Sequence, residues 1–249
     1  MLFSDDITTV VCTCAFWADK LTRTDLQGGF IVSENDYTSN FTGALRREVN
    51  AWNIPGLKAK IQVLDPSAER ATGTDACIIL QNDREFKVCL FEAKWPRLST
   101  HSDYWDSKQK STGTSHFDSQ ITRQNLFSYY AAIWEMFYSE YEFARQPEYF
   151  PDEGSACVWH SYALTASLAR PNSTIPWSDA DLESLLKQQI MAEGKVLGIA
   201  DMLREVCECR KGRPLPNGKF TAAFDNGRLP YEALIISYST KNVDNQVVE

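Results

Sequence analysis

The sequence predicts a single α/β domain in which helices flank a mixed β-sheet. Its 249 residues are 43% hydrophobic and include seven Trp, ten Tyr and thirteen Phe, which suits one packed core better than a disordered chain. Short apolar runs of strand type are interspersed with longer segments of helical type. No repeat, low-complexity tract or clear linker divides the chain, so we expect residues 1–249 to form one domain.

The expected elements follow from these patterns in chain order. Apolar runs of strand type at 75–80 and 86–94 are joined by the turn sequence QNDRE, which predicts a β-hairpin. A possible helix cap at Ser39 or Asn40 marks the start of the second helix. In full, we expect helices at 5–24, 39–52, about 117–145 and 179–206 (one helix or a broken pair), and strands at 57–65, 75–80, 86–94, 156–164 and 231–239.

The charge balance and the N-terminus limit the class of protein. A net charge of −8 argues against broad coating of nucleic acid, although a local basic groove is compatible with it. No apolar run approaches the ~20 residues that span a membrane. The first residues are acidic where a signal peptide would be basic. We therefore expect a soluble cytoplasmic protein without a membrane partner.

Two Cys-x-Cys pairs, Cys12/Cys14 and Cys207/Cys209, lie near opposite ends of the chain. Four thiolates could hold zinc or an iron–sulfur cluster. However, both pairs lie in segments of helical type, where residues two apart point in different directions. Structural cysteines are therefore the favoured interpretation.

Charged residues stand at the ends of the two hairpin strands. Asp75 begins the first strand, and Glu92 and Lys94 end the second. In an antiparallel hairpin the start of one strand lies beside the end of the other. Residues two apart on a strand share a face, so Glu92 and Lys94 point the same way. These three side chains should therefore converge at one edge of the sheet.

The order helix, three strands, helix, strand, together with Gly73-Thr74-Asp75 and Glu92-Ala93-Lys94, resembles the PD-(D/E)XK nuclease superfamily. That superfamily has a restriction-endonuclease-like αβββαβ core. The resemblance covers about 39–165, and it leaves an N-terminal addition and a C-terminal extension of about 175–249 outside the core. The proline of the motif is absent, so only the aspartate is carried over.

The resemblance implies a divalent-metal-dependent nuclease, with DNA as the favoured substrate and RNA as the alternative. Carboxylates are suitable ligands for Mg²⁺ or Mn²⁺, and such a metal activates water for hydrolysis. Lys94 would position the water or stabilise the transition state. The implied metal ligands are Asp75, Glu92, the backbone carbonyl of Ala93 and Glu48, and Gln120 is the candidate active-site glutamine. Gln124 and His116 could share its helix face, or could be ordinary polar surface.

Basic residues follow the Glu-x-Lys strand and provide candidate phosphate contacts. They are Arg97, Lys108, Lys110 and Arg123. Tyr104 and Trp105 lie among them and could stack on bases, within a polar segment at 98–119 that could cover the site. The alternative is an ordinary solvated loop. Glu48 could likewise be an ordinary surface residue whose negative charge is offset by Arg46 and Arg47.

Two other functions are compatible with the sequence. One is a non-catalytic nucleic-acid-binding or assembly subunit on a nuclease-like fold. The other is an enzyme of small phosphorylated metabolites, which would suit the negative net charge. A homo-oligomer or a partner subunit is compatible with each of them.

Overall fold

An open, mixed β-sheet of seven strands runs through the protein and is covered by helices, which confirms the predicted α/β class. The computed structural model describes residues 1–63, 74–99, 104–218 and 232–241. Its helices are α1 (Asp5–Gln27), α2 (Glu34–Ala51), α3 (His116–Gln124), α4 (His160–Ala169), α5 (Asp179–Glu193) and α6 (Ile199–Cys207), with short 3-10 turns η1 (Asn125–Phe127) and η2 (Phe143–Arg145). Its strands are β1 (Leu57–Val63), β2 (Ala76–Gln81), β3 (Glu85–Lys94), β4 (Ala132–Phe137), β5 (Ala156–Trp159), β6 (Leu215–Pro216) and β7 (Glu232–Tyr238).

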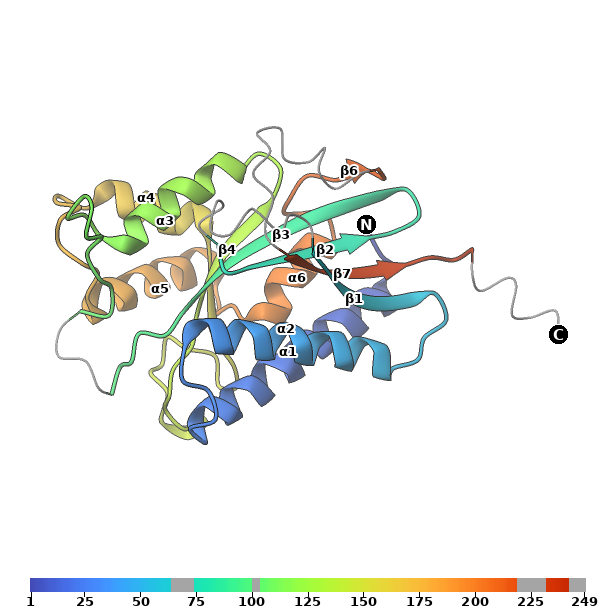
Figure 1. The fold of residues 1–249 in the computed structure, drawn as a ribbon, viewed down its shortest axis with the longest axis horizontal. Coiled ribbons are helices and arrows are strands. Elements are labelled where there is room, and N and C mark those ends of the chain that lie inside the picture. The colour runs from blue at the N-terminus through green and yellow to red at the C-terminus, as the bar shows by residue number, and fades with distance from the viewer. Residues whose placement is uncertain (64–73, 100–103, 219–231, 242–249) are drawn as a thin grey trace.

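The strand order is β1-β7-β2-β3-β4-β5, with β6 paired to the start of β3. β2 and β3 form an antiparallel hairpin, whereas β3 and β4 are parallel. Consequently, the start of β2 and the ends of β3 and β4 lie at the same end of the sheet. Figure 1 shows α1 and α2 crossing one side of the sheet, with α3, α4 and α5 grouped toward the end where β3 and β4 finish.

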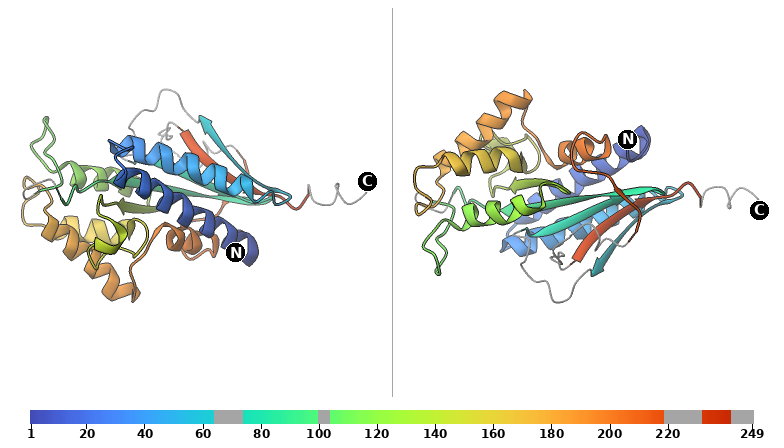
Figure 2. Two further views of the ribbon diagram at one scale, coloured as in Figure 1. Left: turned by 90° about the horizontal axis from the view of Figure 1, so that it is seen from below. Right: turned by 90° about the horizontal axis from the view of Figure 1, so that it is seen from above.

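Strands β2 to β5 are buried on both faces of the sheet, which explains their largely apolar sequences. Ile78, Phe91 and Trp134 face the core under α1, α2 and α6. Their neighbours Ile79, Leu90 and other alternating residues belong to a second cluster on the opposite face. Figure 2 shows the same layering from two further directions. Glu92 alternates with Phe91 and Ala93, so its side chain projects from the face opposite α1 and α2 and meets Gln120 of α3.

The hairpin turn forms where QNDRE predicted it. The backbone N–H of Asn82 donates to the carbonyl of Glu85 at 2.9 Å. The Asn82 side chain also accepts from the N–H groups of Arg84 and Glu85, a local bonding pattern typical of asparagine in turns. This turn fixes the register in which Ala76 lies opposite Phe91 and therefore sets the position of the charged residues at the far end.

Helix α2 begins earlier than the sequence pattern predicted. The hydroxyl of Ser33 accepts a hydrogen bond from Asp36 N at 3.1 Å, so Ser33, and not Ser39, caps the helix. The expected start near Ser39 was wrong because the first turns of α2 are polar and carry little apolar periodicity. The additional turns place Glu34 at the end of the helix nearest to Lys94.

The long helix expected over 117–145 was also wrong. It is instead a short helix, α3, a 3-10 turn and the inner strand β4. Every residue of β4 is buried, so it lacks the alternation that identifies a half-exposed strand, and its aromatic run fits either type of element. The strand expected over 156–164 ends at Trp159, and α4 begins directly at His160.

The C-terminal segment is integral to the sheet. β7 lies between β1 and β2, antiparallel to the first and parallel to the second. The segment 179–206, expected as one helix or a broken pair, forms two helices, α5 and α6, and α6 packs against α1. Among the helices of the described ranges, none has the length and apolar content needed for a membrane span.

Candidate active site

Asp75 lies against the end of β3. Its Oδ2 atom accepts a hydrogen bond from the backbone N–H of Ala93 at 2.9 Å. The hairpin register produces this contact, because Ala76 lies opposite Phe91 and the chain continues from there in both directions. The structure therefore brings Asp75 beside the Glu92-Ala93-Lys94 segment, at the end of the sheet where β2 begins and β3 finishes.

Glu92 and Lys94 form a buried ion pair. The Nζ atom of Lys94 lies 2.5 Å from Oε1 of Glu92, and the two side chains are 8% and 1% exposed, respectively. The side-chain amide of Gln120, on α3, donates to the same Glu92 oxygen. The other oxygen, Oε2, is buried and has no hydrogen-bond partner in the described part of the chain. Oε2 of Glu92 is thus a buried acceptor without a donor among the described residues, close to the side chains of Lys94 and Gln120.

The surroundings shift the proton affinities of all three charged residues. Burial raises the pKa of Glu92 well above its usual value, Lys94 opposes this rise, and Asp75 adds to it. Loss of hydration raises the pKa of Asp75 to about 6, although the residue retains exposed surface, and Lys94 opposes that rise as well. Burial would lower the pKa of Lys94, but the nearby carboxylates outweigh it and raise the pKa above its usual value. Several carboxyl groups therefore surround the single ammonium group of Lys94.

Glu34 is an acidic neighbour that the sequence analysis missed. Its Oε2 atom lies 3.6 Å from Lys94 Nζ, and its Oε1 atom accepts from Trp95 N at 3.0 Å. The residue occupies the first turn of α2 and is partly exposed. Glu34 lies in a polar segment before the expected start of the helix, so no apolar periodicity in the sequence predicted its position beside the end of β3.

Glu48, the acidic residue expected from the same helix, does not join this group. It lies about 14 positions beyond Glu34, or about 21 Å along a helix that rises about 1.5 Å per residue. Its charge acts on Cys14 of α1, whose pKa rises to about 11, chiefly because of burial. The helix predicted to supply an acidic neighbour does so, but through a different residue.

A second buried polar cluster adjoins the first. Glu135 of β4 is the register partner of Glu92 on the adjacent parallel strand and is fully buried. Gln124 donates to Glu135 Oε2 at 3.3 Å. Nδ1 of His160 lies 3.1 Å from Gln124 Oε1 and 3.3 Å from Glu135 Oε1. Both partners of Nδ1 are oxygen atoms, so a ring with its N–H at Nδ1 satisfies this cluster.

Helix α3 connects the two clusters. Gln120 and Gln124 are one turn apart on its buried face, and they reach Glu92 and Glu135, respectively. Ser115 caps this helix by accepting from Asp118 N at 3.0 Å. His116 lies at its first residue, where burial lowers the pKa of the ring and the nearby Lys94 adds to the effect. The position of α3 therefore controls the orientation of both buried glutamates.

The candidate phosphate-binding residues lie in different settings. Arg97 is exposed, and its guanidinium lies 4.3 Å from the centre of the Trp95 ring. Lys108 and Lys110 are exposed in the turn before α3, and Arg123 is half-buried and bonds to Ser119. Only Arg97 lines a pocket beside Glu34.

The segment before α3 is anchored to the protein at several points. Trp105, considered above for base stacking, packs edge-on against Phe117 and Phe137. Asp106 accepts hydrogen bonds from the Ser115 hydroxyl and the Phe117 N–H. Tyr104 is exposed, whereas Gly73 and His101 lie outside the described residues. Trp105 is thus part of the packing and is not available to a base.

All seven cysteines are free thiols. Cys12, Cys14 and Cys207 are buried in the large core cluster on the α1 and α2 side of the sheet, whereas Cys209 is exposed beyond the end of α6. Burial raises the pKa of Cys12 to about 11 and that of Cys207 well above its usual value. Protonated thiols of this kind act as small apolar side chains.

The donor set at the Asp75 edge suits a hard divalent cation. No group of three or more His, Cys, Asp or Glu side chains in the described ranges is arranged to hold a metal by itself. Mg²⁺ commonly uses one or two carboxylates and keeps several waters, so a larger set is not required. The candidate carboxylates here are Glu92, whose buried Oε2 has no partner among the described residues, and Asp75, whose charge acts on Glu92. Comparisons with protein-family models, curated proteins and solved structures find no match to this chain.

Proposed function

We propose that the protein is a divalent-metal-dependent nuclease built on a restriction-endonuclease-like core, with DNA as its favoured substrate. The observation that carries the proposal is the position of Glu92. It is a fully buried carboxylate with one oxygen paired to Lys94 and one without a hydrogen-bond partner in the described ranges. Isolated buried charge is costly, so this arrangement is better explained by a ligand that completes it.

Each residue has a distinct role in the proposed reaction. Asp75, Glu92 and the carbonyl of Ala93 would hold Mg²⁺ or Mn²⁺. When bound, such a metal supplies an activated water and offsets charge on the phosphate. Lys94 would donate from its ammonium group to the attacked phosphate or to the attacking water. Gln120 fixes one oxygen of Glu92, so its role is to position that carboxylate.

The element order supports the assignment of the core. α2, β1, β2, β3, α3 and β4 follow one another in the αβββαβ sequence of the PD-(D/E)XK superfamily. β4 takes the place of the final strand expected at 156–164. β7 lies between β1 and β2 and is an addition from outside the core segment. Preference for DNA over RNA follows from the resemblance to that superfamily, in which most members cleave DNA.

Cleavage of defined oligonucleotides tests the proposal. Purified protein is incubated with single- and double-stranded DNA and RNA in Mg²⁺, Mn²⁺ or EDTA, and the products are resolved by length. We expect cleavage of DNA in either metal and none in EDTA. Glu92→Gln, prepared in the same way, should be inactive while it retains the circular dichroism spectrum of the wild type. Metal-independent cutting, or equal cutting by Glu92→Gln, would contradict the proposal.

A pocket beside Asp75 favours a second candidate function, hydrolysis of a small phosphorylated metabolite. Its volume of about 330 Å³ lies at the lower end of small-ligand pockets. The same metal site could hydrolyse a phosphate ester of that size. Release of inorganic phosphate from nucleoside monophosphates or sugar phosphates, without cleavage of any oligonucleotide, would favour this candidate over the nuclease.

A further inference from the structure

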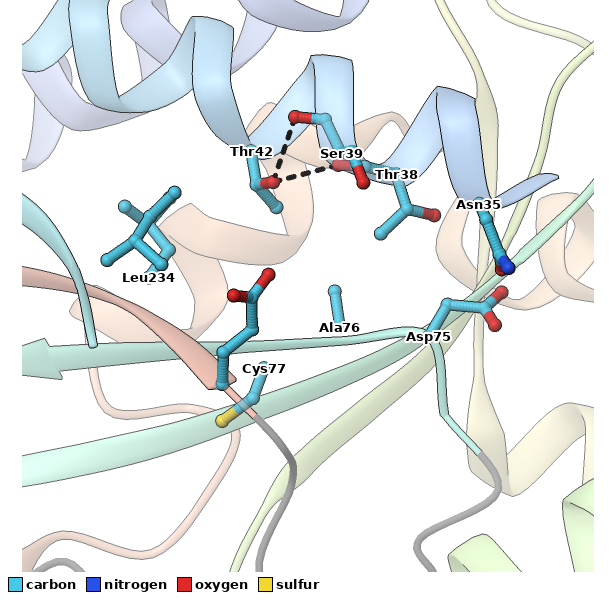
Figure 3. Close-up of a pocket in the computed structure, with 10 residues that line it drawn as sticks. Asn35, Thr38, Ser39, Thr42, Asp75, Ala76, Cys77 and Leu234 are labelled. Atoms are coloured by element: carbon cyan, nitrogen blue, oxygen red, sulfur yellow. Dashed lines mark hydrogen bonds between the residues drawn. The ribbon is translucent and has the colours of Figure 1, made fainter. Parts of the chain in front are cut away.

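Two pockets lie on either side of the first turn of α2. The first, of about 330 Å³, is bounded by α2 and the starts of β2 and β7, with Asp75 at one end. The second, of about 340 Å³, is bounded by Ser33, Glu34, Trp95 and Arg97. Asn35 lines both, so the two pockets are neighbours across this turn. Figure 3 shows Asn35 directed toward Asp75 from the helix above it.

The first pocket has the chemistry of a sugar- and base-binding site. Thr38, Ser39 and Thr42 form its helical wall, and Ala76 and Leu234 contribute apolar surface opposite (Figure 3). The Thr38 hydroxyl is buried and makes no hydrogen bond to any part of the chain that the structure describes. Buried hydroxyls normally have a partner, so this one is available to a ligand.

The charge of the first pocket indicates where a phosphate would not lie. Glu232, at the start of β7, contributes a carboxylate to its lining. Asp75 is the other charged residue among the described residues that line the pocket, and it too is acidic. Repulsion from both would keep a phosphate out of the interior of the pocket. A nucleotide would therefore place its uncharged sugar and base inside, with its phosphate toward Lys94.

The second pocket has a rigid stacking surface. The guanidinium carbon of Arg97 lies 4.3 Å from the centre of the Trp95 ring, which is a cation–π contact. The indole is held by a hydrogen bond from Nε1 to Glu140 at 2.9 Å, and its backbone N–H donates to Glu34. The backbone of Arg97 has φ of 51°, which is uncommon for a side chain of this size. Nucleic-acid-binding proteins use such aromatic and guanidinium planes to stack unpaired bases.

We propose that the site is selective for single-stranded nucleic acid, which crosses the first turn of α2 with one nucleotide in each pocket. This inference rests on the proposed nuclease function and names its substrate class. The bases of a duplex are stacked and paired inside the helix, so they reach pockets of this size only after extrusion. A single strand presents its bases without that cost. It also needs fewer cations along its backbone, which agrees with the acidic chain.

Binding without cleavage tests the strand preference. Wild-type protein in EDTA is titrated into a fluorescein-labelled 12-mer, either single-stranded or annealed to its complement, and anisotropy is recorded. We expect the single strand to bind at least about 10-fold more tightly than the duplex. Arg97→Ala should weaken single-strand binding by roughly 5-fold or more, since one stacking contact is lost. Equal or tighter binding of the duplex would overturn the inference.

A matched control separates the stacking surface from general charge. Arg145 is also exposed and pairs only with Glu142 among the ion pairs of the described residues, so Arg145→Ala removes the same charge elsewhere. Arg145→Ala should bind the single strand within 2-fold of the wild type. Equal weakening by both variants would overturn the inference, as would a nucleoside monophosphate that binds as tightly as the 12-mer. Asn35→Ala provides a second variant at an exposed position that lines both pockets.

The binding and cleavage results distinguish the two proposals. A protein that prefers single strands but cuts no substrate in Mg²⁺ or Mn²⁺ supports the inference about binding and contradicts the nuclease function. A protein that binds and cuts duplex as readily as single strands supports the nuclease function and overturns the inference.

Discussion

The Nζ atom of Lys94 lies 2.5 Å from Oε1 of Glu92, and both side chains are almost fully removed from solvent. A buried ion pair of this kind contributes little net stability, because desolvation offsets most of the attraction. Removing one member is nevertheless costly, because the other charge remains buried. The pair is therefore better understood as part of a site than as a stabilising element of the fold.

The free energy of unfolding should decrease with rising pH, and a bound divalent metal should offset that decrease. Burial raises the pKa of Glu92 well above its ordinary value of 4.5 in the folded protein, whereas the unfolded chain leaves this carboxyl in water. The folded state therefore binds protons more tightly than the unfolded state, so the free energy of unfolding should fall as pH rises above about 4.5. Asp75 acts in the same direction between 3.8 and about 6. Lys94 stays charged throughout this range.

Urea unfolding at pH 5 and pH 8 measures this effect. Without metal, Glu92→Gln should lose less stability than the wild type between the two values, because it carries no titrating group. Mg²⁺ at about 100 times its dissociation constant should stabilise the wild type by about 2.7 kcal/mol at pH 8. The exposed Glu183→Gln serves as the control and should behave like the wild type. Identical pH dependence of Glu92→Gln and the wild type would contradict the assignment.

Metal affinity should itself fall in acid. Protons compete with the metal for Asp75, whose pKa is raised to about 6 by loss of hydration. Calorimetric titration at pH 5, 6, 7 and 8 should therefore show affinity that weakens by up to about 10-fold per pH unit below about 6. Asp75→Asn should bind metal weakly at every pH. A constant affinity from pH 5 to 8 would remove Asp75 from the site.

Glu34 and Glu48 form a matched pair of variants on one helix. Glu34 lies 3.6 Å from Lys94, whereas Glu48 is about four turns away. Glu34→Gln should slow cleavage by about 10-fold or more, because it removes a charge that holds Lys94 in place. Glu48→Gln should cleave within 2-fold of the wild type. A larger loss of cleavage with Glu48→Gln would support Glu48 as the acidic residue of the site, which is the role that the resemblance implied.

The cluster of Gln124, Glu135 and His160 should contribute to stability. His160→Ala removes a buried donor and leaves Glu135 with one remaining bond, which should cost about 1–3 kcal/mol in the free energy of unfolding. Thr165→Ala, on an exposed position of the same helix, should change stability by less than about 0.5 kcal/mol. Urea denaturation measures both. An unchanged midpoint for His160→Ala would show that the cluster is not a stabilising unit.

The sequence was sufficient to predict the features that depend on local order. The hairpin required only two β-rich runs and a turn, and it placed Asp75 beside Glu92 and Lys94. The mixed sheet followed from the number and spacing of such runs. These features depend on neighbouring residues in the chain, for which periodicity and turn chemistry are informative.

The features that could not be predicted depend on contacts between distant segments. Glu34 reaches Lys94 only because a serine cap extends α2 through a polar stretch. Glu135 lies beside Glu92 in the sheet because a fully buried strand, β4, forms where a helix was expected. His160 joins them because β5 ends immediately before it. Uniform burial removes the alternation that would distinguish such a strand from a helix.

Single-turnover cleavage by Lys94→Met tests the central claim most directly, because it separates the chemical step from binding. The account predicts that this variant, saturated with substrate in Mg²⁺, cleaves at least ~100-fold more slowly than the wild type, equivalent to about 2.7 kcal/mol of barrier. Its affinity for the same oligonucleotide in EDTA should change by less than about 3-fold. Lys187→Met, on the exposed face of α5, should match the wild type in both measurements. Normal cleavage by saturated Lys94→Met, with much weaker binding, would contradict a catalytic role for the Glu92–Lys94 pair.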